Sequence, residues 1–323
     1  MKKSLLLLVL LFSLNILAAE KQLVFLNQHY GTHERQIFDL WLPATRKEAP
    51  LVIYIHGGGF VMGSKDEISN SNMYLVKKYN KEGIAFAAIN YRYLSHASLQ
   101  DIMREDIAGF VQYMRLNAKK YNLDKKIIMP YGFSAGGSSS LWLATHNDIA
   151  LKKSDNPLKL ESSRVFAAGH LNAQVSYDYT VWYKYFGKEN TDKFIGSQVW
   201  TRYRLNSYED IYTEAGQKIR EDLDMYGNMT TDDCPILFAN DLNDNETRDG
   251  NHFVHSPRHT RLLSEKAKSL GLETVVRIKA DGTGTLDPHG AVFDFFLQRL
   301  INKKKDRKSL KKRLKLQSKA TQV

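Results

Sequence analysis

The stretch that decides the fold is Gly132-Phe133-Ser134-Ala135-Gly136-Gly137, which matches the pattern G-x-S-x-G. An apolar run over residues 127–131 precedes it, and a Ser-, Leu- and Ala-rich stretch follows it. The pattern predicts a sharp turn from a strand into a helix, with Ser134 at its tip. A serine at such a turn has a strained backbone, which explains the glycines on both sides. Taken alone the signal is weak, because an ordinary Gly/Ser turn has the same residues.

A second glycine-rich segment, His56-Gly57-Gly58-Gly59-Phe60, directly follows the strand predicted for Leu51–Ile55. Three successive glycines let the backbone bend so that two N–H groups face one substrate oxygen. Backbone N–H groups of this kind already point toward the position of the oxyanion, whereas a side-chain donor would have to change its conformation first. The two segments occur in the order expected for an oxyanion hole and its nucleophile. Neither G-x-G-x-x-G nor Gly-Lys-Ser/Thr occurs, which excludes a phosphate-binding loop.

Short apolar runs alternate with helix-like stretches through the rest of the body. The predicted strands are 22–26, 36–42, 51–55, 84–89, 127–131, 165–168, 236–239 and 274–278. The predicted helices are 71–81, 99–119, 136–145, 258–270 and 291–301. Strands that are buried on both faces and joined by helices predict an α/β protein with a mostly parallel, doubly wound sheet.

Four segments together resemble the α/β-hydrolase superfamily. They are His56–Phe60, Asn90-Tyr91-Arg92, Glu105–Gly109 and Gly132–Gly137. Within that superfamily they look most like hormone-sensitive-lipase-type carboxylesterases and bacterial feruloyl and acetyl esterases. The resemblance is close over residues 38–142 and extends in outline to the last third of the chain. It implies that Ser134 is the nucleophile and that the oxyanion hole is formed by the N–H groups of Gly58, Gly59 and Ala135.

A serine hydroxyl needs an adjacent base, and the chain order in this fold is Ser, then acid, then His. His289 lies in Asp287-Pro288-His289-Gly290, after the last predicted strand and before the last helix, where the family places its base. We therefore predict that His289 is the catalytic base. The alternative is a histidine on a surface loop. His56 is expected to steady the glycine loop.

The catalytic acid is expected in the loop after the strand at 235–239, which contains Asp241, Asp244 and Asp249. The offset usual in the family favours Asp244, with Asp249 and Asp241 as alternatives. The loop carries an insertion, Asn245–Asn251, relative to the family. All three aspartates therefore remain candidates for the acid, because sequence spacing does not determine the geometry of a loop.

The same region contains His252, His255 and His259 in the spacing H-x2-H-x3-H, which is typical of some metal sites. Pro257 interrupts any helix that would align the three imidazoles, and no strong fourth ligand follows. Neither a metal nor a cofactor is expected. The simpler interpretation is a loop that leads into a helix near Pro257.

The chain is divided into three parts by its composition. Residues 1–19 combine Lys2 and Lys3, an apolar run and Ala18-Ala19, which predicts a secretory signal peptide and a periplasmic or extracellular protein. Residues 20–302 form the predicted hydrolase domain, with an aromatic-rich cap inserted at about 147–233. The aromatic side chains of this cap form either its own core or a pocket for sugar or aryl groups. Cys234 is the only cysteine, so a disulfide framework is excluded.

Residues 303–323 form a basic tail with ten Lys/Arg and one Asp. The net charge of the chain is +11, and Lys2 and Lys3 account for two more positive charges, so residues 4–302 sum to zero. A neutral body argues against nucleic acid as a partner. The tail is expected to be solvated, although Leu310 and Leu314 would allow it to extend the last helix. Its functional alternative is weak electrostatic contact with anionic envelope surfaces.

These observations predict an exported serine carboxylesterase that acts on small-molecule or polysaccharide esters, with acetyl and feruloyl esters of carbohydrates as candidates. The first alternative is a serine peptidase of the prolyl-oligopeptidase type, but the N-terminal propeller of that group is absent from this sequence. The second alternative is a non-catalytic envelope-binding protein with a hydrolase fold. Retention of Ser134, the Gly58-Gly59 pair and His289 argues against it.

Overall fold

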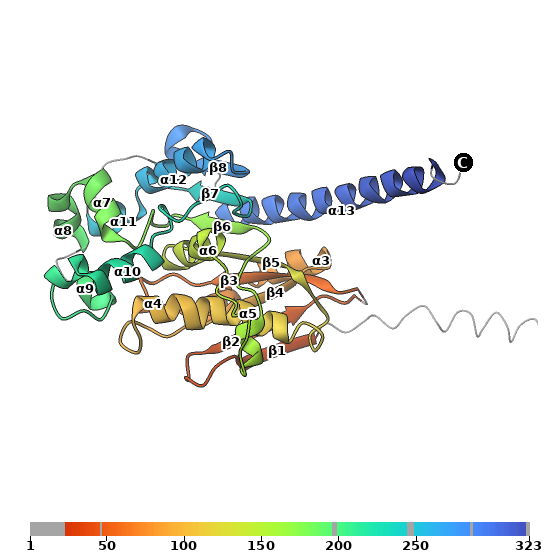
Figure 1. Ribbon diagram of the computed structural model, residues 1–323, viewed down its shortest axis with the longest axis horizontal. Coiled ribbons are helices and arrows are strands. Elements are labelled where there is room, and N and C mark those ends of the chain that lie inside the picture. The colour runs from red at the N-terminus through yellow and green to blue at the C-terminus, as the bar shows by residue number, and fades with distance from the viewer. Residues whose placement is uncertain (1–22, 46, 196–198, 244–248, 285–286, 321–323) are drawn as a thin grey trace, which may run out of the picture.

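An eight-stranded sheet forms the centre of the molecule in the computed structural model (Figure 1). The structure describes residues 23–45, 47–195, 199–243, 249–284 and 287–320, and the signal peptide predicted for residues 1–19 lies outside them. The strands are β1 (Leu23–His29), β2 (Ile37–Leu42), β3 (Ala49–Ile55), β4 (Ala85–Ile89), β5 (Leu123–Phe133), β6 (Ala168–Leu171), β7 (Ile236–Asn240) and β8 (Thr274–Ile278).

The strands are ordered β1-β2-β4-β3-β5-β6-β7-β8. Strand β2 pairs antiparallel with both β1 and β4, and every other neighbouring pair is parallel. Strands β3, β4 and β7 and the central part of β5 are buried and rich in apolar residues, as expected for a sheet covered on both faces. The predicted α/β class and mostly parallel sheet are confirmed.

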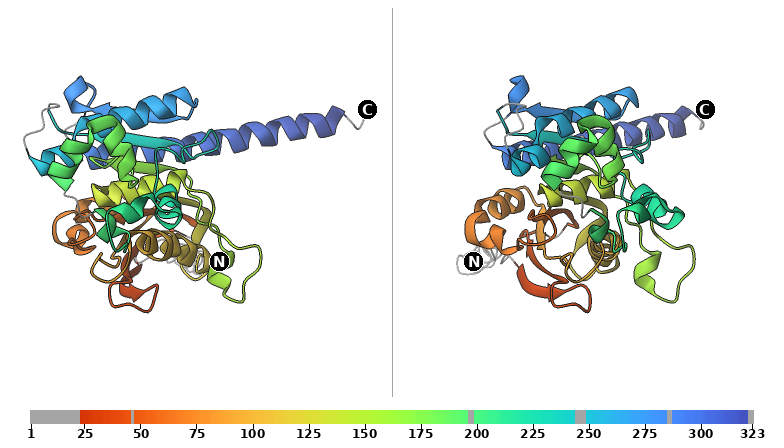
Figure 2. Two further views of the ribbon diagram at one scale, coloured as in Figure 1. Left: turned by 60° about the vertical axis from the view of Figure 1, so that its left-hand side comes forward. Right: turned by 90° about the vertical axis from the view of Figure 1, so that its left-hand side faces the viewer.

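Helices cover both faces of this sheet, as the end-on view in Figure 2 shows. One face packs against α2 (Asp66–Ser71), α3 (Met73–Lys81) and the first turns of α13 (Pro288–Ala320). The other packs against α5 (Ala108–Leu116), α6 (Ala135–Thr145) and α12 (Pro257–Ser269). The sheet is therefore doubly wound, and its strand ends carry the loops where ligands bind in such folds.

The helix predicted for 99–119 is broken into three pieces. They are α4 (Leu99–Asp101), the π-helical turn η1 (Ile102–Ile107) and α5. Asp106 lies in the π-helical turn and is fully buried, where it accepts hydrogen bonds from Arg92 and Gln36. This buried carboxylate ties the segment after β4 to the π-helical turn.

The remaining helices form a group above the carboxyl ends of the strands. They include α7 (Tyr179–Phe186), α8 (Lys188–Ile195), α9 (Val199–Arg202), η3 (Glu209–Tyr212) and α10 (Glu214–Asp222). We refer to residues 179–222 as the cap. The range of 147–233 predicted for this insertion also contains η2 (Pro157–Leu160) and β6, which belongs to the sheet. Trp182, Phe186 and Tyr203 are buried, so part of the aromatic content forms the cap's own core.

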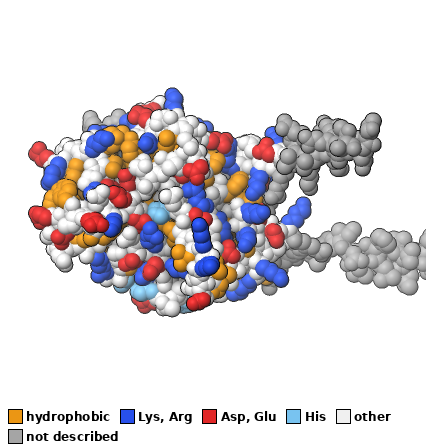
Figure 3. Space-filling model, in the orientation of Figure 1, with side chains coloured by type: hydrophobic (Ala, Val, Ile, Leu, Met, Phe, Trp, Pro, Cys, Tyr) orange, Lys and Arg blue, Asp and Glu red, His pale blue; other side chains and the backbone are white. Residues whose placement is uncertain are grey.

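The last helix, α13, continues through the basic tail and extends away from the body to Ala320 (Figure 1). Near the start of the tail, Lys303 Nζ lies 4.5 Å from the centre of the Phe166 ring. The structure therefore selects the helical alternative for the tail. Figure 3 shows acidic and basic side chains intermixed over one face of the body, as a neutral body requires. Among the described residues, no helix is apolar and long enough to cross a bilayer.

Candidate active site

Ser134 lies at the turn between β5 and α6, as predicted. Its backbone angles are φ 53° and ψ −121°, a left-handed conformation that side chains other than glycine rarely adopt. The turn is possible because Gly136 lies directly against β3, where an added Cβ would be 1.9 Å from the Ile55 carbonyl oxygen. The strain holds the hydroxyl of Ser134 above the strand ends, at the N-terminus of α6.

The histidine that the structure places beside this serine is His255. Its Nε2 atom lies 2.8 Å from Ser134 Oγ, within hydrogen-bond distance. Its Nδ1 atom lies 2.8 Å from the carbonyl oxygen of Asn251. A carbonyl can only accept, so Nδ1 carries the proton and Nε2 is free to accept the proton of Ser134. This is the tautomer that a general base for a serine nucleophile requires.

His255 is the last residue of the short helix α11 (Gly250–His255), and three contacts hold this helix in place. Asp249 caps its N-terminus, accepting a hydrogen bond of 2.7 Å from the backbone N–H of His252. Phe253 packs against the aromatic rings of the cap, including Trp182. His259 donates from Nε2 to the Phe253 carbonyl at 3.1 Å, and burial lowers the pKa of His259 to about 3, which keeps it neutral.

The surroundings of His255 lower its pKa, chiefly because the ring is largely removed from water. The hydrogen bond to Asn251 and the negative charge of Asp241 act in the opposite direction. His255 is therefore a neutral imidazole near pH 7, ready to accept a proton.

The three aspartates proposed as the catalytic acid differ in their position and contacts. Asp244 lies outside the described residues. Asp249 is engaged as the cap of α11. Asp241 is hydrogen-bonded to the Asn172 side chain and influences His255 through its charge. Among the described carboxylates, none forms a hydrogen bond with His255, whose orientation comes from the Asn251 carbonyl.

The structure corrects the prediction for His289. No hydrogen bond joins His289 to Ser134 within the described chain, where His255 holds that position. His289 instead packs against the rings of Tyr54 and Tyr131, at centroid distances of 6.2 and 5.9 Å. Its Nδ1 is buried without a hydrogen-bond partner among the described residues. The physical reason is that α13 begins at Pro288, which draws His289 into the helix and toward the core instead of leaving it on a loop.

His255 was named in the sequence only as part of a metal-like histidine cluster. Two signals could have found it: it follows Ser134 and the acid candidates in chain order, and it precedes the helix break at Pro257. The structure separates the three histidines by function and burial. His255 contacts Ser134, whereas His259 is fully buried behind it.

The predicted oxyanion loop lies directly beside Ser134. An added Cβ on Gly57 would be 3.5 Å from Ser134 Cβ, which shows how closely the two segments approach. Gly58 has φ 103°, and a Cβ there would be 2.2 Å from the Met62 carbonyl oxygen, so only glycine fits. Within the described structure the N–H groups of Gly58 and Gly59 donate no hydrogen bond. That of Ala135, in the first turn of α6, has no partner within the helix.

A set of polar contacts keeps this loop rigid. His56 Nδ1 donates to the Gly57 carbonyl at 2.7 Å, and its ring stacks on Tyr91 at 4.2 Å. The Tyr91 hydroxyl donates to the His56 carbonyl at 2.9 Å. Arg35 donates to the carbonyls of Tyr91 and Gly63. Burial lowers the pKa of His56 to about 4, so the ring stays neutral and structural, in the supporting position expected from the sequence.

A pocket of about 380 Å³ opens beside the Ser134–His255 pair. It is lined by Phe133, Asn172, Asp241, Leu242, Asp249, Asn251, His252 and His255. Because His255 lies in its wall, this pocket adjoins the side on which a leaving group would receive its proton.

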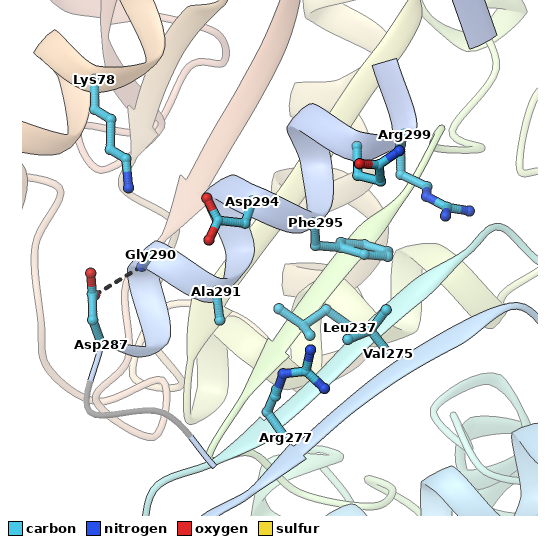
Figure 4. Close-up of a pocket in the computed structure, with 11 residues that line it drawn as sticks. Lys78, Leu237, Val275, Arg277, Asp287, Gly290, Ala291, Asp294, Phe295 and Arg299 are labelled. Atoms are coloured by element: carbon cyan, nitrogen blue, oxygen red, sulfur yellow. Dashed lines mark hydrogen bonds between the residues drawn. The ribbon is translucent and has the colours of Figure 1, made fainter. Parts of the chain in front are cut away.

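A second pocket, of about 490 Å³, lies at the start of α13 and is shown in Figure 4. Asp287 caps this helix by accepting a hydrogen bond of 2.8 Å from the Gly290 N–H. Lys78, Arg277 and Asp294 also line it, and neither Ser134 nor the glycine loop does. The nucleophile therefore has no part in this pocket.

The sheet order, the strained serine turn and its histidine define the α/β-hydrolase fold. A family model described as BD-FAE matches residues 38–181, from β2 into the cap. The chain is 30% identical over 99 residues to "Putative alpha/beta hydrolase R526" of Acanthamoeba polyphaga mimivirus, covering 31% of this chain and 28% of that protein. It is 29% identical over 124 residues to "Esterase LipC" of Mycobacterium tuberculosis, covering 37% and 29%. The chain spans less than a third of the length of these relatives.

Two solved structures share the fold over most of the chain. A "Truncated form of carbohydrate esterase from gut microbiota" has a TM-score of 0.58 at 18% identity, covering 88% of this chain and 98% of that one. An "acetyl ester-xyloside bifunctional hydrolase" from Caldicellulosiruptor lactoaceticus has a TM-score of 0.55 at 19% identity, covering 75% and 76%. The predicted resemblance is confirmed: the matches include the BD-FAE family model, a protein named as an esterase and a solved carbohydrate esterase that shares the fold.

Proposed function

We propose that this protein is a serine carboxylesterase in which Ser134 is the nucleophile and His255 is the general base. One observation carries the proposal: His255 Nε2 lies 2.8 Å from Ser134 Oγ at a strained strand-to-helix turn. A serine with this backbone conformation and this partner has the arrangement of an activated nucleophile. The adjacent glycine loop supplies the donors that a developing oxyanion needs.

The reaction follows from these positions. Ser134 Oγ attacks the ester carbonyl carbon while His255 Nε2 takes its proton, and the carbonyl oxygen becomes an oxyanion. The N–H groups of Gly58, Gly59 and Ala135 are the donors proposed to bind that oxyanion. His255 then protonates the leaving alcohol, and the acyl group stays on Ser134. Water, deprotonated by His255, attacks the acyl-enzyme and releases the acid.

In this mechanism the Asn251 carbonyl orients His255, and Asp241 acts through space. A neutral carbonyl stabilises an imidazolium less than a hydrogen-bonded carboxylate does, since charge-assisted bonds are roughly twice as strong. The Asp241 charge partly compensates, because it favours the protonated form of His255. We infer that the Ser134–His255 pair has electrostatic support from Asp241, while Asp244, which lies outside the described residues, stays a predicted catalytic acid.

Carbohydrate esters are the proposed substrate class. The support is the BD-FAE match and the names of the two solved structures, one a carbohydrate esterase and one an acetyl ester-xyloside hydrolase. The pocket beside His255 adds carboxylate and amide groups, from Asp241, Asp249 and Asn172, that can hydrogen-bond sugar hydroxyls.

We further propose that the protein is exported and that the basic tail makes weak electrostatic contact with anionic envelope surfaces. The support is the leader-like sequence of residues 1–19 and the ten Lys/Arg of residues 303–323. Truncation after Ile301 should abolish retention on anionic vesicles at low salt and leave hydrolysis of neutral esters within about twofold. Retention by the shortened protein would contradict the role of the tail.

The esterase proposal is tested with nitrophenyl esters from acetate to palmitate, beside acetylated and feruloylated polysaccharides. A serine-reactive organophosphonate should label the wild-type protein at Ser134 and stop turnover. A protein that is folded and labelled nowhere, and that hydrolyses none of these esters, would contradict the proposal.

A further inference from the structure

The cap places a cation over the oxyanion loop. Arg202 ends helix α9, and its Nη1 lies 3.4 Å from the carbonyl oxygen of Gly59. The guanidinium has five N–H donors, and this contact is long for a hydrogen bond. Within the described chain no carboxylate forms an ion pair with Arg202, and the side chain is half-buried.

The neighbouring residues hold Arg202 in this place. Tyr203 is buried, and its hydroxyl donates to the Tyr177 carbonyl. Arg204 donates to the Leu94 carbonyl at 3.1 Å. The backbone N–H of Leu94 in turn donates to the Phe60 carbonyl at 2.8 Å, next to Gly59. The two residues that follow Arg202 are therefore fastened, one to Tyr177 and the other through Leu94 to the oxyanion loop.

The position of His255 decides which half of an ester lies near Arg202. His255 must protonate the leaving oxygen, so the alcohol half lies toward α11 and its pocket. Arg202 approaches the site from the oxyanion loop, and so its neighbour is the acyl half. Gly57 nearly touches Ser134, and the two residues from Gly57 to Gly59 span at most about 7 Å. Arg202 contacts Gly59 at the far end of this segment, so an acyl group held on Ser134 can extend along the loop toward the guanidinium.

We propose that Arg202 determines specificity by binding a carboxylate at the far end of the acyl group. Monoesters of short dicarboxylic acids, such as glutarate, would then be preferred, and hydrolysis would release the dicarboxylic acid and the alcohol. The chemistry fits because a guanidinium binds a carboxylate through two parallel N–H···O bonds. This inference rests on the proposed esterase function.

The test compares monoethyl glutarate with ethyl glutaramate, which has the same shape and carries an amide in place of the carboxylate. For the wild-type protein we expect kcat/KM to be on the order of tenfold higher for the glutarate ester, mainly through KM. In Arg202→Gln the ratio should approach one. In Arg202→Lys, which keeps the positive charge but loses the pair of parallel N–H donors, the ratio should be intermediate.

Lys218→Gln is the matched control, because it removes a cation of the cap whose side chain is 70% exposed and paired with Glu214, and it should keep the wild-type ratio. An unchanged ratio in Arg202→Gln would overturn the inference. An equal fall in Lys218→Gln would also overturn it, since the effect would then come from the overall charge of the cap. Hydrolysis of ethyl glutaramate without discrimination refutes only this inference, whereas failure to hydrolyse any ester refutes the esterase function itself.

Discussion

His255 and His289 occupy two similarly built regions with different surroundings. His255 ends the helix that follows β7, and His289 lies in the first turn of the helix that follows β8. Both nitrogens of His255 have polar partners, Ser134 Oγ and the Asn251 carbonyl. The His289 ring packs between aromatic side chains, and its Nδ1 has no partner among the described residues. The comparison shows that the partners of both ring nitrogens, and not the position in the sequence alone, distinguish a histidine that can act on the nucleophile from one that is packed in the core.

Each helix is also capped by an aspartate, which makes the two regions a matched pair. Asp249 accepts from the N–H of His252, and Asp287 accepts from the N–H of Gly290. Capping of this kind stabilises a helix by about 1 kcal/mol, wherever the helix lies. Only the first of the two caps sets the position of a side chain that contacts Ser134.

The largest expected effect comes from removing the Ser134 hydroxyl, which contacts His255 and not His289. Ser134→Ala should lower kcat for nitrophenyl acetate by several orders of magnitude, because nucleophile and base act as a unit. The same substitution should change the NMR titration of His255, which loses its hydrogen bond, and leave that of His289 unaltered. A change in the titration of His289 alone would show that His289, and not His255, contacts Ser134. Substantial residual turnover would contradict Ser134 as the nucleophile.

A smaller effect is expected from the two helix caps. Asp249→Ala and Asp287→Ala should each lower the free energy of unfolding by about 1 kcal/mol, measured by denaturant titration. Asp249→Ala should also lower kcat by about tenfold, since small displacements of catalytic groups slow the reaction strongly. Asp287→Ala should leave kcat within about twofold. Equal losses of kcat in the two variants would show that the α13 region also contributes to catalysis.

The smallest expected effect is a shift in pH dependence. His255 must be neutral to act as a base, so kcat/KM should fall as the pH drops through its pKa, which burial places below 6.5. The negative charge of Asp241 raises that pKa. Asp241→Asn should therefore lower it and move the acidic limb of the profile to lower pH. A shift to higher pH would show that Asp241 does not act through its charge on His255.

The sequence predicted the fold and half of the site, because those features are encoded locally. The strand, the glycines and the helix around Ser134 are contiguous, and so are the elements of the oxyanion loop after β3. Side chains that meet across a loop are different, since their approach depends on the whole path of the chain. His255 reaches Ser134 from 121 residues away, through a six-residue helix held by Asp249 and by aromatic contacts with the cap. The chain order and the nearby Pro257 are compatible with that arrangement, but neither distinguishes it from a surface loop.

His289 shows the opposite case, in which a sequence rule and a local packing preference compete. Its place after the last strand fits the family order, but Pro288 at the first helical position starts α13 immediately before it. The imidazole then lies on a helix whose neighbouring residues Val292 and Phe296 are buried in the core. Helix initiation therefore decides where this histidine points.

The central claim is that His255, and not His289, activates Ser134. Its most direct test is the value of kcat for nitrophenyl acetate in His255→Asn and His289→Asn, with unfolding curves to confirm that both proteins are folded. We expect kcat to fall by about a thousandfold or more in His255→Asn and to stay within about fivefold of wild type in His289→Asn. A folded His255→Asn protein with near wild-type kcat, beside an inactive His289→Asn protein, would contradict the account.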